Sequence, residues 1–96
     1  MSLPVKLSKR AKQDILDIGE YYTKEHNVPY VAEMFVDFVS EACNRLEAFP
    51  DAWVERNGYR RILMDKFPYS IYYKITSKKI SVLRVFHNSR RPDSWR

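Results

Sequence analysis

The sequence predicts a two-layer α+β domain in which a helical hairpin packs on one face of an antiparallel sheet, in the order β-α-α-β-β-β. Two observations predict this fold. Apolar residues recur at helical spacing in the first half of the chain and at strand spacing in the second half. With 96 residues, of which 45% are apolar, the chain is expected to form a single domain over residues 1–96.

The first half of the chain predicts a short strand followed by two helices. Val5 to Leu7 alternates in the way that is typical of an edge strand. Ser8 is a favourable N-cap for a helix from Lys9 to about His26. Pro29 suits the first turn of a second helix, which is expected from about Tyr30 to Phe49.

The second half predicts three strands, at Tyr59 to Met64, Tyr69 to Ile75 and Lys79 to about His87. Their short turns make them an antiparallel meander. The third strand is apolar on both faces, which is typical of a central strand, so Val5 to Leu7 is expected to pair with its free side. Following the chain direction through the elements, we expect that pairing to be antiparallel.

One face of this sheet is expected to stay free of helices. Alternation along the strands places Tyr72, Val82 and Phe86 on that face, among Lys74 and Arg84. An exposed apolar patch surrounded by positive charge is typical of a binding surface.

The charge is distributed unevenly along the chain. Residues 1–55 hold six Lys/Arg and ten Asp/Glu, a net charge of −4, whereas residues 56–96 hold eleven and two, a net charge of +9. A basic segment of this density favours an anionic partner, either nucleic acid or an acidic peptide. The alternative is a solvated basic face without a specific ligand.

Several classes of site are excluded by composition. A single cysteine, Cys43, excludes an internal disulfide and a cysteine-built zinc site, and two distant histidines suggest no other metal site. Two glycines cannot form a glycine-rich phosphate loop, so no cofactor is expected. No apolar run approaches the roughly 20 residues that span a bilayer, and a cytoplasmic protein is expected.

The strongest motifs lie in the basic half. They are Phe67-Pro68-Tyr69, Ile71-Tyr72-Tyr73, and His87 followed by Arg90, Arg91, Pro92 and Trp95. Together with the helical hairpin and Phe49-Pro50-Asp51, they closely resemble the ParE-like branch of the ParE/RelE toxin superfamily, whose members are often described as plasmid stabilisation proteins. The resemblance covers nearly the whole chain.

The resemblance implies the toxin component of a bacterial type II toxin–antitoxin system, neutralised by a cognate antitoxin in a hetero-oligomer. ParE-type members act on DNA gyrase, whereas RelE- and YoeB-type members cleave mRNA on the ribosome. Those ribonucleases have an arginine where this chain has Ser70 and a tyrosine where it has Trp95, and both departures favour the gyrase-directed, non-enzymatic branch. Two alternatives remain, an mRNA endonuclease and a non-toxic nucleic-acid-binding relative.

Candidate site residues follow from the motifs and the predicted faces. His87 lies where YoeB-like enzymes have a catalytic histidine, although a histidine at a strand end is more often structural. Arg60 and Arg61 are expected on opposite faces, so at most one of them joins the basic surface. The candidates for binding the target or a phosphate are Lys74, Tyr72, Arg84, Arg90, Arg91 and Trp95. The candidates for binding the antitoxin are Leu16, Val31, Met34, Phe38, Val82 and Phe86.

Overall fold

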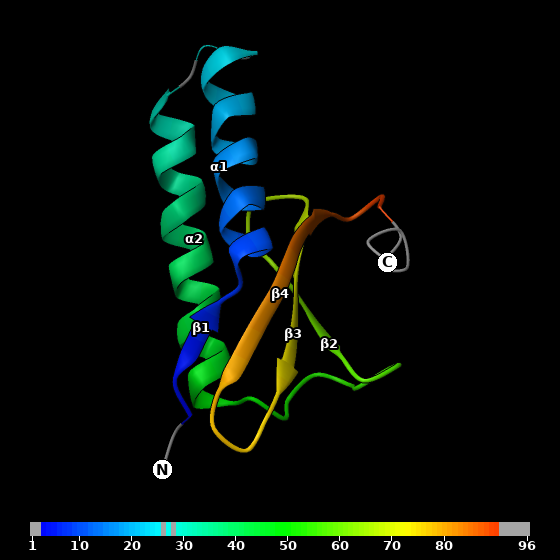
Figure 1. Ribbon diagram of the computed structural model, residues 1–96. Helices are drawn as coiled ribbons and strands as arrows, with labels where there is room; N and C mark the ends of the chain where they lie inside the picture. The colour runs from blue at the N-terminus through cyan, green and yellow to red at the C-terminus, as the bar shows by residue number, and fades with distance from the viewer. Residues whose placement is uncertain (1–2, 26, 28, 91–96) are drawn as a thin grey trace.

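The computed structural model describes residues 3–25, 27 and 29–90, and it confirms the predicted two-layer α+β fold. Two helices form an antiparallel hairpin that covers one face of a four-stranded sheet (Figure 1). In chain order the elements are β1 (Val5–Leu7), α1 (Lys9–Lys24), α2 (Pro29–Ala48), β2 (Arg60–Leu63), β3 (Tyr69–Ile75) and β4 (Ile80–His87). No helix in the described part of the chain is long and apolar enough to cross a membrane.

The helix boundaries follow from local chemistry. The Ser8 hydroxyl accepts a hydrogen bond from the Ala11 backbone N–H at 3.0 Å, which confirms Ser8 as the N-cap of α1. The first helix ends at Lys24, two residues before the predicted boundary, and Asn27 has a positive φ of 50°. Such a left-handed residue cannot continue a right-handed helix, and α2 begins two residues later.

The strand order is β1-β4-β3-β2, which confirms β4 as a central strand with β1 beside it. The predicted direction of that pairing was wrong, because β1 and β4 are parallel. Only Ser8 separates β1 from α1, so the chain continues in the direction of β1. The chain then reverses four times, between α1 and α2, between α2 and β2, between β2 and β3, and between β3 and β4. An even number of reversals leaves β4 parallel to β1, and the sheet is mixed.

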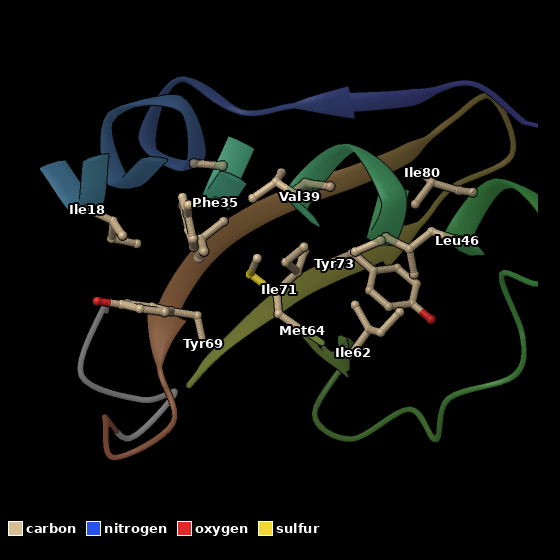
Figure 2. Packing of buried hydrophobic residues seen from close by; sticks show 14 residues of the cluster. Ile18, Phe35, Val39, Leu46, Ile62, Met64, Tyr69, Ile71, Tyr73 and Ile80 are labelled. Carbon is tan, nitrogen blue, oxygen red and sulfur yellow. The ribbon is translucent and has the colours of Figure 1, made fainter. Parts of the chain in front are cut away.

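The core lies between the helices and the sheet (Figure 2). From α2, Phe35, Ala42 and Leu46 are fully buried against the strands. The ring of Phe35 makes edge contacts with Phe67 and Tyr69, with centroid distances of 5.3 and 5.4 Å. Burial of these apolar side chains is the main stabilising term of the fold, at roughly 25 cal/mol per Å² removed from water.

Candidate functional site

The face of the sheet that points away from the helices is called the outer face here. Cross-strand partners share a face, so the register defines it in rows. One row joins Arg61, Tyr72 and Arg84, and the next joins Leu63, Ser70 and Phe86. The alternate rows, such as Ile62, Ile71 and Val85, belong to the core. Lys74, from a third outer row, is exposed as predicted.

A β-bulge in β4 changes the predicted composition of this face. Tyr72 pairs with Arg84 while Tyr73 pairs with Val82, so Leu83 is an extra residue without an opposite partner. The inserted residue reverses the alternation, which brings Val82 and Val85 to the same side. Val82 is therefore completely buried in the core, and its prediction as a surface contact was wrong.

Two further predictions of exposure were wrong. Tyr72 and Phe86 do lie on the outer face, but only 1% and 2% of their surfaces are exposed. The guanidinium groups of Arg84 and Arg90 lie over the Phe86 ring, 4.4 and 4.2 Å from its centroid. The Tyr72 ring contacts Phe86 and Tyr59, both at 5.8 Å. On the outer face the Phe86 ring is therefore covered by two cations and held by cation–π attraction, so this part of the face is not an open apolar patch.

Helix α1 holds Arg84 in place through Asp14. The carboxylate of Asp14 accepts hydrogen bonds from Nε and Nη2 of Arg84, at 2.8 and 2.9 Å, and from the backbone N–H of Val85 at 2.9 Å. The bond from Asp14 raises the pKa of Arg84 further. Ser8 donates its N–H to the Val82 carbonyl and its hydroxyl to the Leu83 carbonyl. Strand β1 has only three residues, and beyond its end Ser8 and Asp14 bind the backbone polar groups of β4 that β1 would otherwise pair with.

His87 lies on the other side of the sheet. It pairs with Tyr69, a core residue, and lines a cavity of about 300 Å³ with Tyr21, Tyr22 and Pro68. Burial raises the pKa of Tyr69 to about 12, and a hydrogen bond with Tyr22 adds to the shift. The His87 Nδ1 atom accepts the backbone N–H of Ser89 at 3.1 Å, so a neutral His87 carries its proton on Nε2.

The remaining predicted residues are dispersed. Leu16 and Met34 expose 65% and 44% of their surfaces, as a contact on the helices requires, whereas Val31 and Phe38 are half-buried. Phe38 packs against Phe67 with a ring distance of 5.7 Å. Arg91 and Trp95 lie outside the described residues.

Sequence reasoning missed a pocket that lies on the outer face beside β2. It is a cavity of about 480 Å³, lined by Val54, Arg56, Asn57, Tyr59, Arg61 and Tyr72. Arg61 is on the outer face, while Arg60 is bonded to the Trp53 carbonyl, so the predicted separation of these two arginines is confirmed. The dipeptide Asn57-Gly58 is typical of the turn of a two-residue hairpin, and it could have been used to predict that Arg56 lies beside β2.

A model of the ParE toxin of type II toxin–antitoxin systems matches residues 5–92. The chain belongs to the ParE toxin family. None of the curated proteins compared with this ParE-family chain is similar enough in sequence to count as a relative.

Solved structures share the fold of this ParE-family toxin. The chain is similar to a protein of the chromosomal ParDE toxin–antitoxin system from P. aeruginosa, with a TM-score of 0.77 and 23% identity, over 90% of this chain and 96% of that one. A RelBE toxin–antitoxin complex from Mycobacterium tuberculosis contains a chain with a TM-score of 0.57 and 19% identity, covering 91% of this chain and 99% of that one.

Proposed function

We propose that this ParE-family protein is a cytoplasmic toxin that binds DNA gyrase, without cleaving RNA, and that a cognate antitoxin neutralises it. One observation carries the choice of gyrase over mRNA. The only histidine among the described residues, His87, lies on the helix side of the sheet, whereas Arg84 lies on the outer face.

Cleavage of RNA by a 2′-hydroxyl needs a proton acceptor or donor and a cation around the same scissile phosphate. A sheet separates His87 from Arg84 here, and the Arg84 guanidinium already binds Asp14. The position that carries an arginine in the ribonucleases is Ser70, which is fully buried and donates its hydroxyl proton to Asn88 Oδ1. These placements favour a toxin that acts by binding.

Two observations support the proposal that an antitoxin binds this protein. Both structural neighbours named above come from toxin–antitoxin systems. In addition, Leu16 on α1 and Met34 on α2 leave large apolar side chains in solvent, as an amphipathic partner segment requires. Of the predicted antitoxin contacts, these two side chains are the most accessible.

The target is tested by inducing the chain in growing cells and following growth, DNA breaks and mRNA together. We expect growth arrest and gyrase-dependent DNA breaks with intact mRNA, and we expect His87→Ala to retain both effects. Primer extension that detects cleavage of translated mRNA, abolished by His87→Ala, would establish the endonuclease instead. Growth without arrest, combined with salt-dependent binding of nucleic acid, would identify the non-toxic relative.

The antitoxin is tested by co-expressing the product of the adjacent reading frame. We expect Leu16→Ser and Met34→Ser each to weaken neutralisation while toxicity stays unchanged. Val36→Ser is the matched control, because Val36 is 47% exposed and projects from α2 about 200° away from Met34. If the antitoxin neutralises all three variants equally well, the helices are not part of the surface that binds the antitoxin.

A further inference from the structure

The pocket beside β2 is built by a tight hairpin. Arg56 and Tyr59 exchange backbone hydrogen bonds of 2.8 and 3.1 Å across Asn57 and Gly58. Both turn residues have positive φ angles, 54° and 84°, as a type I′ turn requires. The bridge places the side chains of Arg56 and Tyr59 next to each other on one side.

The same side continues along β2. Arg61 follows Tyr59 by two residues and therefore shares its face, and Arg61 pairs with Tyr72 on β3. The Tyr59 ring packs edge-on against Tyr72, with centroids 5.8 Å apart. Tyr72 is buried and Tyr59 is half-buried, so Tyr72 forms the floor of the pocket and Tyr59 a wall. Two arginines and two tyrosines thus line one cavity.

Within the described part of the chain, the guanidinium groups of Arg56 and Arg61 have no carboxylate partner, and no acidic residue lines the pocket. The other arginines of the sheet differ. Arg84 is paired with Asp14, and Arg60 is paired with Asp51 at 3.6 Å. Arg56 and Arg61 are also exposed, so their donors are available to a ligand.

We propose that this pocket binds a nucleotide unit, with the phosphate held by Arg56 and Arg61 and the base against the ring of Tyr59. Guanidinium groups match phosphate oxygens in a planar, two-bond geometry, and aromatic side chains stack on bases of any sequence. The Asn57 amide adds a polar group to the lining. The pocket shares Tyr72 with the residues predicted to bind the target, but nucleotide binding by Arg56, Arg61 and Tyr59 does not depend on the proposed action on gyrase.

The size and composition of the pocket favour a nucleotide over the carboxylate of an acidic peptide. One guanidinium suffices for a carboxylate, whereas this pocket presents two of them beside the half-buried ring of Tyr59. Its volume of about 480 Å³ lies within the range of pockets that enclose small organic ligands. An acidic side chain would leave most of that space and the Tyr59 ring unused.

The test is an NMR titration of the purified full-length chain with inorganic phosphate, AMP, oligothymidylate, oligouridylate and a glutamate-rich peptide. We expect phosphate and AMP to shift the signals of Arg56, Tyr59 and Arg61, with tighter binding of AMP. Arg61→Gln and Arg56→Gln should each weaken AMP binding about tenfold or more. Tyr59→Leu should weaken AMP but not phosphate, and Lys12→Gln, which removes one exposed charge from α1, should change neither.

The oligonucleotides separate a free nucleotide from a nucleic-acid backbone as the source of the phosphate. The ligand is a nucleic-acid strand if oligonucleotides bind more tightly than AMP and their affinity decreases with salt. That decrease should be less steep in Arg61→Gln than in the unaltered chain. Equal binding of AMP and oligonucleotides assigns the pocket to a single nucleotide. The proposal is overturned if no phosphate compound binds, if the arginine variants bind like the control, or if the glutamate-rich peptide binds more tightly than every nucleotide.

Discussion

The link between Asp14 and Arg84 gives the sharpest prediction for stability. Replacing Asp14 with alanine removes three hydrogen bonds to one carboxylate, two from Arg84 and one from the Val85 backbone. Both charged side chains are largely buried, with 12% and 15% of their surfaces exposed. Loss of one partner leaves a poorly solvated guanidinium and an unpaired backbone N–H.

Each hydrogen bond to a charged group contributes about 1.5–3 kcal/mol, but the Arg84 guanidinium regains some water once Asp14 is gone. We therefore expect Asp14→Ala to lower the free energy of unfolding by about 2–4 kcal/mol, which corresponds to a fall in Tm of about 4–8 °C per kcal/mol for a domain of this size. Asp14→Asn should cost less, because its carbonyl oxygen can still accept the Val85 N–H.

The assay is urea unfolding followed by circular dichroism. Asp17→Ala is the matched control, because Asp17 lies one turn along α1, is exposed, and only accepts a hydrogen bond from Gln13. It should change stability by no more than about 0.5 kcal/mol. A double-mutant cycle with Arg84→Ala should give a coupling of at least about 1 kcal/mol. If Asp14→Ala unfolds like Asp17→Ala, or the coupling is absent, the ion pair does not hold β4 to α1.

The other predictions concern two glycines, two tyrosines and the cysteine. Gly19→Ala should stabilise the protein by about 0.5–1 kcal/mol, because the new methyl group meets Ala32 at 3.8 Å, an ordinary contact, inside a helix. Gly58→Ala should destabilise it by about 1–2 kcal/mol, because φ is +84° there. Equal changes in the free energy of unfolding for Gly19→Ala and Gly58→Ala, measured in urea, would refute this difference between the two glycines. Burial raises the pKa of Tyr69 and of Tyr73 to about 12, above the unfolded value of 10.0, so their contribution to stability is complete below pH 10 and is lost as the pH rises towards 12. Tyrosinate absorbance should show a late phase near pH 12 with the amplitude of two tyrosines, and Tyr73→Phe should halve that amplitude. Titration of every tyrosine together near pH 10 would contradict the burial of these two hydroxyls. Burial also raises the pKa of the Cys43 thiol, so a thiol reagent should modify it slowly in the native protein and rapidly in denaturant, and equal rates would contradict the buried position.

The helices and strands could be predicted from the sequence, because each depends on local chemistry. Ser8 fixes the start of α1 through one hydrogen bond to Ala11, and β3 has the predicted bounds because its residues alternate over a full strand. The motifs around Tyr69 and His87 were also enough for the ParE resemblance, which the family match over residues 5–92 confirms.

The contacts between side chains of different elements could not be predicted in the same way, because they depend on how those elements pack. The bulge at Leu83 has no local signal, yet this single extra residue moves Val82 into the core and keeps Phe86 on the outer face. Asp14 and Arg84 are 70 residues apart in the chain, so their pairing could not be read from either segment. Periodicity reports the neighbours of a residue along the chain, whereas register and ion pairs depend on contacts between distant elements.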